Sequence, residues 1–431
     1  MYIKKVIINN IRSIEHFEME FEAGKEAGWH VLIGDNGAGK STVVQSIALA
    51  LIGEDNSKAL RLNLSDWLSN LKNEGSIKLE ILRQNIDKII SGKVNIEFPI
   101  SDIIDYSAWI DTIKITKKGN AAFEIQEVLQ APYDIGSLTY GTGWFSCSFG
   151  PFRRFTGGDK EWNVLYKVNN IVASHLSVFG ENTSLTVALD WLQDLNYKSL
   201  DGKDEATETL EGLTRFINET NLLPNGEKLQ KINSDGIFFK DGNDNIIPIH
   251  QLSDGFRSVL SLTFELFRQL NISYPVNIWK ELADGKFIID LPGVVLIDEI
   301  DAHLHPTWQT RIGQWFTQYF PNIQFIVTTH SPLVCRACEK GSIWRLRAPG
   351  DKGGNQVEEI KGTDRDRLIF GNVLDAYGTE VFGNNVSQSE EGEKMLKELA
   401  DLNLKSFKGK TLTEGEKQRI EELKKILPTE A

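Results

Sequence analysis

Apolar and polar residues follow two different periods near the start of the chain. The run Ile3–Ile8 has the character of a strand, and Phe17–Ala23 alternates apolar with acidic residues. Trp29–Ile33 is continuously apolar, as in a short buried strand. After a glycine-rich turn, Ser41–Leu51 has the apolar spacing of a helix. The pattern predicts strands, then a loop, then a helix.

The middle of the chain changes from strands to helices. Ser76–Leu82 and Val94–Phe98 have the pattern of strands in a side sheet. Between residues 159 and 223 the pattern is mostly helical, with Ser184–Leu195 and Ala206–Leu222 as the clearest pieces. No heptad repeat runs through them, so a long coiled-coil arm is not predicted.

The second half returns to alternating strands and helices. Gly236–Ile249 predicts a hairpin, and Phe256–Leu270 predicts a helix directly after it. Then follow a buried strand at Gly293–Ile297, a helix at Pro306–Tyr319 and another buried strand at Ile323–Thr328. Strands without alternation are expected in a parallel sheet that is covered on both faces. We therefore predict an α/β fold.

The last part of the sequence is charged and helical. Arg347–Asn355 is a turn or linker, and Ser387-x-x-Glu390 and Thr413-x-x-Glu416 match helix capping boxes. We predict four segments: the first half of an α/β domain (residues 1–158), a mainly helical insertion (159–235), the second half of the domain (236–346) and a C-terminal extension (347–431). The extension would be a linker followed by helices for docking or oligomerisation.

Composition narrows the class of protein. Of the 431 residues, 41% are hydrophobic and 25% are charged, a balance that predicts a folded globular chain. The net charge of −13 argues against a surface that binds nucleic acid everywhere, but allows a local basic patch. The chain start lacks the pattern of a signal peptide, no apolar run is long enough to span a bilayer, and only three cysteines occur. We expect a cytoplasmic protein without a membrane partner.

One glycine-rich loop carries a specific chemical prediction. Gly34–Ser41 has the pattern G-x-x-x-x-G-K-S between a strand and a helix. In such a loop, backbone N–H groups surround phosphates, the lysine reaches the outer phosphate oxygens and the serine hydroxyl binds Mg²⁺. The residues expected to bind nucleotide are Asn36, Gly37, Ala38, Gly39, Lys40, Ser41 and Thr42. The expected cofactors are ATP and Mg²⁺.

Three further motifs follow the phosphate loop. The strand Gly293–Ile297 ends in Asp298 and Glu299, which are placed to support Mg²⁺ and to polarise a water molecule. The strand Ile323–Thr328 is followed by His330, which is placed to bond near a γ-phosphate; a structural histidine at a strand end is the alternative. The turn containing Ser253 and Gly255 opens a helix, so it is either an anion site or a capped helix start.

The order of these four motifs resembles the ATP-binding-cassette ATPases, and specifically their SMC/RecF-like branch. The resemblance covers residues 1–346 and implies a P-loop ATPase head with a mostly parallel core sheet, an antiparallel side sheet and a helical insertion. It makes Glu299 the catalytic base, His330 the switch histidine and Asp298 a support for Mg²⁺. It also implies that Ser253, Asp254 and Gly255 contact the γ-phosphate bound by a second copy, as a homodimer closed around two ATP molecules.

The resemblance also extends to several arginines. Arg12 looks like the N-terminal arginine that this branch places near the phosphates. Phe145–Arg154 contains no glutamine for the expected glutamine loop, but looks like a stretch of single-chain defence ATPases. Arg153 and Arg154 are therefore expected to face phosphate or DNA, with solvated arginines in a surface turn as the alternative.

Two other runs invite a metal or redox interpretation. His303 and His305 follow the catalytic carboxylate, where the family has a dimer-contacting loop, and this position favours an interface over a metal site. Cys335 and Cys338 form a single pair, which does not predict a functional thiol site.

The C-terminal extension is not expected to contain a nuclease. Asp364–Asp366 lies in a loop-like run, and the extension is too short for a nuclease domain.

The resemblance implies an ATPase but leaves its task open. The chain is similar to bacterial anti-phage ATPases of the Septu (PtuA-like) or PARIS type, which act with an HNH nuclease or a Toprim effector, so nucleic acid would be reached through that partner. A RecF-like DNA-repair ATPase is the alternative, and the net charge weakens it. A transporter ATPase is disfavoured by Asp254, which stands where transporters have a second glycine.

The phosphate loop is tested by Lys40→Ala. This change removes the cation expected to neutralise the outer phosphates, so ATP binding should be abolished in calorimetric titration. A variant that still bound ATP tightly would contradict the assignment.

Overall fold

The computed structural model describes most of the chain. The described residues are 1–69, 72–84, 86, 89–91, 94–96, 109–118, 122–130, 138–140, 143–153, 155, 164–165, 169–180, 186–223, 226–274, 276–347, 350, 355–373, 376, 390–408 and 412–427. They form two compact units, Met1–Phe370 and Gly371–Ala431. None of the helices in these ranges is long and apolar enough to cross a membrane.

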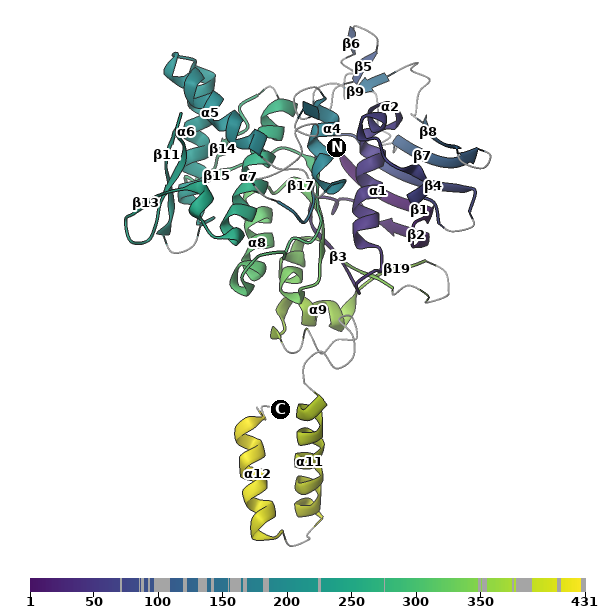
Figure 1. Ribbon diagram of the computed structural model, residues 1–431, viewed down its shortest axis with the longest axis vertical. Helices are drawn as coiled ribbons and strands as arrows, with labels where there is room; N and C mark the ends of the chain where they lie inside the picture. Colours follow the sequence, from purple (N-terminus) through teal and green to yellow (C-terminus); the bar gives the residue numbers. More distant parts are fainter. Residues whose placement is uncertain are drawn as a thin grey trace. The chain divides into compact units, whose positions relative to one another are not determined.

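A six-stranded core sheet runs through the first unit (Figure 1). Its strands, in spatial order, are β10 (Ser146–Phe149), β16 (Gly293–Ile297), β17 (Ile323–Thr329), β3 (Gly28–Gly34), β18 (Ile343–Leu346) and β19 (Val357–Glu359). The first five run parallel, and β19 pairs with β18 in the antiparallel sense. Every residue of β16 and β17 is buried, which explains their unbroken apolar sequences.

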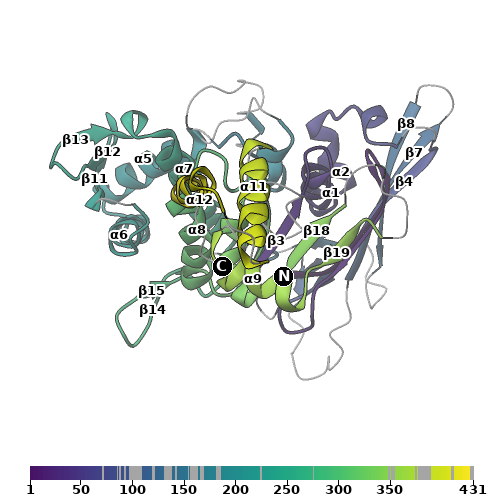
Figure 2. The same cartoon turned by 90° about the horizontal axis from the view of Figure 1, so that it is seen from below.

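An antiparallel sheet lies on the other side of helix α1 (Lys40–Ile52). Its order is β2 (Ile14–Glu20), β1 (Tyr2–Ile11), β4 (Glu74–Leu82), β7 (Trp109–Lys118) and β8 (Ala122–Gln130). Helix α1 contacts β1, β4 and β7 on one side and β3, β16 and β17 on the other, so it fills the space between the two sheets (Figures 1 and 2). The Gln324 side chain donates to the carbonyl oxygen of Ile3 at 2.8 Å and accepts from its N–H at 2.7 Å, which joins the sheets directly.

Helices α7 (Asp254–Ser273) and α8 (Pro306–Tyr319) pack against the core sheet: α7 contacts β10 and α8 contacts β3. The predicted insertion forms α4 (Asn170–His175), α5 (Thr186–Leu200) and α6 (Asp204–Glu219), followed by a small sheet of β11 (Lys228–Asn233), β12 (Gly236–Lys240) and β13 (Ile246–Pro248). Phe216 of α6 packs edge-on against Phe267 of α7 and Trp315 of α8, with ring centroids 5.1 and 5.5 Å apart. This aromatic cluster attaches the insertion to the core.

Shorter elements complete the first unit. They are α2 (Glu54–Ser57), β5 (Ile89–Ser91), β6 (Val94–Ile96), β9 (Leu138–Tyr140), β14 (Lys280–Glu281), β15 (Phe287–Ile288) and α9 (Gly362–Phe370), with 3₁₀ turns at 58–60, 64–66, 176–178, 249–251 and 332–340.

The second unit contains a helical hairpin of α11 (Glu390–Phe407) and α12 (Glu414–Ile426). Leu399, Leu423 and Leu427 form its buried core. The Thr413 hydroxyl accepts from the Glu416 N–H at 3.3 Å, and the Glu416 carboxylate accepts from the Thr413 N–H at 2.8 Å. The predicted capping box at Thr413 is thus present, whereas Ser387 lies outside the described residues.

The fold class predicted from sequence is confirmed: a mostly parallel core sheet, an antiparallel side sheet, a helical insertion and C-terminal helices. One local prediction is wrong. Asp364–Asp366 lies in helix α9 and not in a loop. Gly362, whose φ is 62°, opens this helix, and the buried Leu368 and Ile369 anchor its last turn. The predicted boundary at residue 347 falls between β18 and β19, which pair in the core sheet.

Candidate nucleotide-binding site

The carboxyl ends of four neighbouring parallel strands bring the predicted motifs to one edge of the core sheet. The phosphate loop follows β3, Asp298 and Glu299 follow β16, His330 follows β17 and Gly150–Arg153 follows β10. In open α/β sheets ligands bind at this edge. Residues far apart in the sequence are therefore brought together because their strands are parallel neighbours.

The phosphate loop enters α1 through two glycines with positive φ, 78° at Gly37 and 106° at Gly39. Gly39 is the N-cap of α1, and no side chain caps the helix. The first N–H groups of the helix are therefore available to an anion. A Cβ at Gly39 would lie 3.0 Å from the Ser13 hydroxyl, so the turn between β1 and β2 packs directly against the loop. Asn36 and Gly37 are exposed, while Ala38 and Thr42 are buried.

Lys40 is held inside the loop. Its ammonium donates to the backbone carbonyl oxygens of Gly34 at 2.7 Å and Asp35 at 3.0 Å, and its side chain is largely buried. Burial lowers the pKa of Lys40, and the negative charges of Asp298, Glu299, Asp35 and Asp301 act in the opposite direction. The lysine therefore lies in the field of the carboxylates that follow β16, as a shared phosphate and metal site requires.

The two carboxylates after β16 are oriented by the next strand. The Thr328 hydroxyl of β17 donates to Asp298 Oδ1 at 2.5 Å and accepts from the Glu299 N–H at 2.8 Å. Asp298 is buried with 3% of its surface exposed, whereas Glu299 is partly exposed. Glu299 has φ 47°, an uncommon conformation for a residue with a side chain. Such local strain is typical of functional sites.

A buried arginine holds this turn in place. Arg153 is 5% exposed, and all of its side-chain nitrogens donate hydrogen bonds inside the chain. The acceptors are the carbonyl oxygens of Gly150 (3.0 Å), Asp298 (2.8 Å), Glu299 (3.0 Å) and Ile300 (3.4 Å) and the hydroxyl of Ser258 (3.2 Å). Burial lowers the pKa of Arg153 to about 10, against the opposing charges of Asp298, Asp301 and Glu299. The guanidinium thus ties β10, the turn after β16 and helix α7 together.

These contacts correct the prediction for Arg153. It neither faces phosphate or DNA nor lies solvated in a surface turn, because its donors are used by the turn that carries Asp298 and Glu299. Arg154 lies outside the described residues. Sequence reasoning missed this positioning function, although an arginine soon after a buried strand was a signal that it lies near the sheet edge.

Arg12 lies in the turn that packs on the phosphate loop. Its guanidinium donates to the Gln45 side chain at 2.5 Å and stacks on Trp67, with 4.6 Å between the guanidinium carbon and the ring centroid. Burial lowers its pKa, and Asp66 opposes this shift. Arg12 has φ 50°. The structure therefore places the predicted arginine beside α1, with its side chain on Gln45 and Trp67.

The predicted signature turn opens α7. Ser253 is the N-cap, but its side chain makes no capping hydrogen bond, and both Ser253 and Asp254 are exposed. Asp254 pairs with Arg257 in the first turn. A Cβ at Gly255 would lie 2.9 Å from the His303 carbonyl oxygen, so only glycine allows this close approach to the loop after Glu299. Ser253 and Asp254 therefore face solvent, while Gly255 packs against the protein.

The other predicted histidines and cysteines lie before helix α8 and after strand β17. His305 caps α8 by accepting from the Thr307 N–H, and His330 is exposed at the end of β17. Cys335 and Cys338 are buried, and burial raises the pKa of both thiols. Among the residues that the structure describes, no group of three or more histidine, cysteine, aspartate and glutamate side chains is arranged to hold a metal ion.

A family profile described as "AAA domain" matches residues 5–235, more than half of the chain. The chain belongs to the AAA domain family. A second AAA domain profile, whose description adds AbiEii toxin and Type IV TA system, matches residues 159–336. Together these two profiles cover the segments that carry all four predicted motifs.

Similar proteins are found in bacteria. The chain is 27% identical to the Septu protein PtuA of Bacillus mycoides (strain KBAB4), over 96% of this chain and 52% of PtuA. It is 24% identical to the retron Vc95 probable ATPase of Vibrio cholerae serotype O1 biovar El Tor, over 78% of this chain and 74% of that protein. The chain thus spans about half the length of the Septu relative. These matches confirm the resemblance stated from the motifs.

Solved structures of SMC heads are also similar. An SMC head bound to the C-winged helix domain of ScpA covers 84% of this chain and 98% of its own, with 16% identity and a TM-score of 0.48.

Arg153→Lys tests whether the buried guanidinium positions the turn that carries Asp298 and Glu299. Lysine keeps the charge but has a single nitrogen, so several carbonyl oxygens lose their donor. We expect ATP binding to change little and ATP hydrolysis to fall by about ten- to a hundredfold, because small displacements of catalytic groups are costly. Calorimetry and phosphate release measure the two effects, and Arg311→Lys on the exposed surface of α8 is the control. Hydrolysis at the wild-type rate would contradict the positioning function.

Proposed function

We propose that the protein is an ATP-hydrolysing subunit that dimerises around two ATP molecules and controls a separate effector in anti-phage defence. The observation that carries the ATPase part is the convergence of Lys40 with Asp298 and Glu299 at one edge of the sheet. The similarity to Septu and retron ATPases supports the defence context.

Each side chain at this edge has a distinct task in the proposed reaction. Uncapped N–H groups at the start of α1 and the Lys40 ammonium bind the phosphates. The Ser41 hydroxyl and Asp298 would hold Mg²⁺, and the Asp298 carboxylate is oriented by the Thr328 hydroxyl, which donates to its Oδ1 atom. When bound, Mg²⁺ neutralises charge that develops on the phosphates. Glu299 takes a proton from the attacking water, and His330 bonds near the γ-phosphate.

The signature turn supports a composite site. Ser253 leaves the N-terminus of a 20-residue helix exposed and without a side-chain cap, a suitable site for an anion supplied from outside the chain. Gly255 packs on the carbonyl oxygen of His303, in the short loop that follows Glu299, so the turn lies against the loop that carries the proposed catalytic residue. We infer that the turn binds the γ-phosphate held by a second copy.

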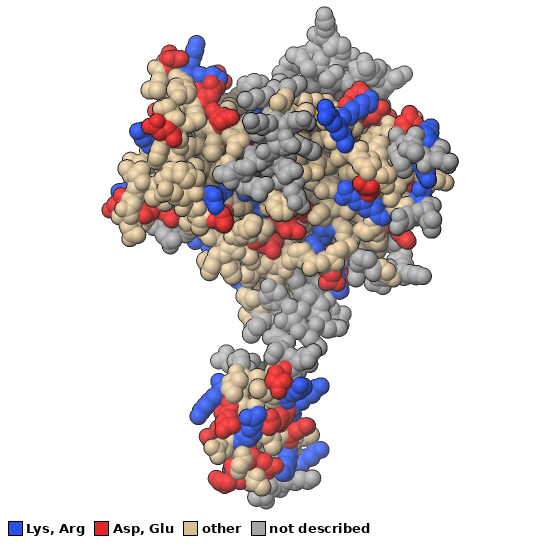
Figure 3. Space-filling model, viewed as in Figure 1, with Lys and Arg blue, Asp and Glu red and all other residues tan. Residues whose placement is uncertain are grey.

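The effector is expected to be an HNH nuclease or a Toprim protein, and nucleic acid would be contacted through it. The face shown in Figure 3 is compatible with this proposal, because both Lys and Arg and Asp and Glu side chains are scattered over its described residues. The net charge of −13 also opposes extensive direct contact with nucleic acid.

Glu299→Gln tests hydrolysis. The amide cannot accept the proton of the attacking water, so ATP should still bind while phosphate release falls by about a hundredfold or more. The trapped dimer should be visible by light scattering with ATP and Mg²⁺, and Glu208→Gln on the exposed side of α6 should behave as wild type. A Glu299→Gln protein that stayed monomeric with ATP would refute the dimer.

Ser253→Arg tests the composite site. The bulky cation at the exposed turn should leave ATP binding to the monomer largely intact but prevent ATP-driven dimerisation and hydrolysis. The matched control is Ser234→Arg, in the exposed turn between β11 and β12. If Ser253→Arg abolished ATP binding by the monomer, the turn would belong to its own chain's site and the proposal would fail.

A further inference from the structure

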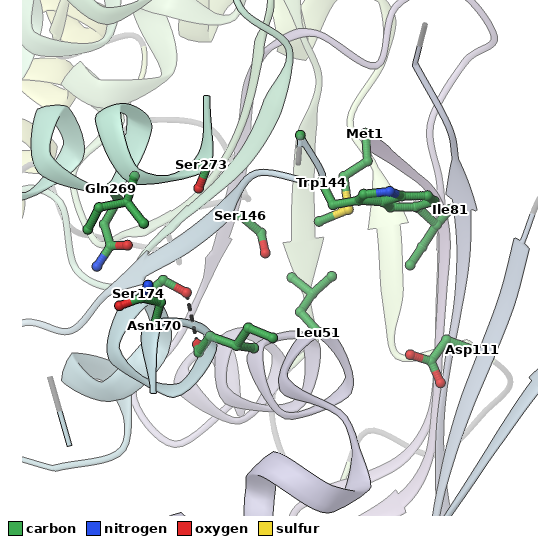
Figure 4. Close-up of a pocket in the computed structure, with 13 residues that line it drawn as sticks. Met1, Leu51, Ile81, Asp111, Trp144, Ser146, Asn170, Ser174, Gln269 and Ser273 are labelled. Atoms are coloured by element: carbon green, nitrogen blue, oxygen red, sulfur yellow. Dashed lines mark hydrogen bonds between the residues drawn. The ribbon is translucent and has the colours of Figure 1, made fainter. Parts of the chain in front are cut away.

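A cavity of about 340 Å³ lies at the opposite edge of the core sheet from the phosphate loop (Figure 4). Its wall includes the entry to β10 at Trp144 and Ser146, the end of α1 at Leu51 and the end of α7 at Ser273. The phosphate loop and the signature turn lie at the other ends of α1 and α7. The cavity is therefore distinct from the proposed ATP site, and its volume is within the range of small-molecule sites.

A strained backbone presents the indole ring of Trp144 to the cavity. Trp144 has φ 42°, an uncommon conformation for a residue with a side chain, and it follows Gly143, whose φ is 95°. The Gly143 N–H donates to the Ser273 carbonyl oxygen at 3.1 Å, which ties this turn to the end of α7. The ring lies beside Met1 and Ile81 (Figure 4). Because backbone strain of this kind is concentrated at ligand-binding and active sites, the turn points to a function for the wall that it forms.

Ser146 places a hydroxyl group in the middle of the lining residues (Figure 4). Its Oγ atom is 3.0 Å from His175 Nε2, and the Nδ1 atom of the same ring is 3.0 Å from Ser148 Oγ. Ser148 Oγ is also 3.3 Å from the carbonyl oxygen of His175, an atom that can only accept. The cavity hydroxyl is therefore one end of a chain of three polar contacts.

The positions of the protons in this chain follow from its geometry. Burial lowers the pKa of His175 to about 3, so the ring is neutral and one of its nitrogens accepts. For a neutral ring, only one arrangement makes all three contacts hydrogen bonds: Ser148 donates to the His175 carbonyl oxygen, His175 Nδ1–H donates to Ser148, and the Ser146 hydroxyl donates to Nε2. The Ser146 proton is thus used, and its oxygen can only accept from an occupant of the cavity.

Ser146 is a strong and reachable acceptor. A hydroxyl that donates to an imidazole accepts more strongly than a free hydroxyl, because hydrogen bonds in a chain polarise one another. His175 is fully buried, whereas Ser146 is partly exposed, so an occupant of the cavity can approach the serine but not the histidine. Within the part of the chain that the structure describes, no other group donates to Ser146 Oγ.

The wall favours a neutral, apolar body around this acceptor. Asp111 and the terminal residue Met1 line the cavity, but they are only 2% and 4% exposed, and none of the other described lining residues carries a charge. A charged ligand would lose its hydration without reaching an exposed opposite charge. Trp144, Leu51 and Ile81 instead provide apolar surface on which a ring can pack.

We propose that this cavity binds a neutral aromatic compound that carries a hydroxyl group. The O–H of the ligand donates to Ser146 Oγ, and its ring packs against Trp144 and Leu51. Burial of the ring provides most of the binding free energy, while the hydrogen bond selects ligands that have a donor at this position. Phenols are the simplest members of this class. The proposal does not depend on the ATP site, because the cavity shares no lining residue with it.

The test is a fluorine NMR titration of the full chain, without nucleotide, with 4-fluorophenol and 4-fluorotoluene. The two compounds have nearly the same size, but only the phenol can donate a hydrogen bond, and the toluene is the more apolar. Apolar burial alone therefore predicts tighter binding of 4-fluorotoluene. We expect 4-fluorophenol to bind about three- to tenfold more tightly, the contribution of one hydrogen bond. No binding of 4-fluorophenol, or equal or tighter binding of 4-fluorotoluene, would overturn the proposal.

Variants of the lining serines identify the acceptor. Ser146→Ala should reverse the order, so that 4-fluorotoluene binds more tightly than 4-fluorophenol, and its binding of 4-fluorotoluene shows that the cavity is intact. Ser174→Ala and Ser273→Ala are matched controls from the same wall and should keep the preference for the phenol. Ser174 already donates to the Ile171 carbonyl oxygen at 2.9 Å. A preference that survived Ser146→Ala, or that disappeared in either control, would show that Ser146 is not the acceptor.

Discussion

The turn after β16 depends on one buried guanidinium. A turn that places a non-glycine residue at φ 47° and directs backbone carbonyl oxygens inward is unstable by itself. Arg153 satisfies those oxygens and reaches Ser258 on α7 with its remaining donor. The burial of a permanent cation is tolerated because the carboxylates of the site lie nearby and every N–H is used. The geometry of Glu299 follows from this arrangement.

Charge balance links this turn to the phosphate loop. Lys40 and Arg153 are both buried, and both lie in the field of the same acidic residues, Asp298, Glu299 and Asp301. Thr328 and Thr329 of β17 donate to Asp298 and Asp301, respectively, each at 2.5 Å. The acidic groups are therefore oriented before any ligand arrives. Such preorganised polar groups are the main source of electrostatic stabilisation in enzymes.

Much of the fold could be predicted from the sequence because its signals are local. The bounds of β16 and α8 match the predicted Gly293–Ile297 and Pro306–Tyr319, since a continuous apolar run and a proline at a helix start are strong local patterns. The position of the phosphate loop between β3 and α1 was predictable for the same reason. The assignments of individual site residues remain predictions.

The features that could not be predicted depend on tertiary packing. Arg153 lies between Phe152 and Arg154 in the turn after β10, and only the meeting of β10, β16 and α7 decides that it is buried. Asp111 follows the alternation of an ordinary strand, yet its neighbours β4 and β8 and the end of α1 enclose it. The sequence of one segment does not show which other segments will bury its side chains. The sequence of Asp364–Asp366 is charged and predicts a loop. In the structure it belongs to helix α9, because the buried Leu368 and Ile369 that follow it anchor the helix.

The bond between Arg153 and Ser258 also bears on how such proteins diversify. About a hundred residues lie between these two positions, including α4, α5, α6 and the sheet of β11, β12 and β13. Because the hydrogen bond closes the chain at the base of this segment, the turn after β16 is held by residues that lie before and after the segment. The part from α5 to β13 can therefore change in length and sequence as long as its aromatic anchor at Phe216 is kept, whereas His175 and Ser177 bond to β10 and Gly150 and belong to the core. Evolution and protein engineering alike could exchange the part from α5 to β13 as a module for recognising new partners.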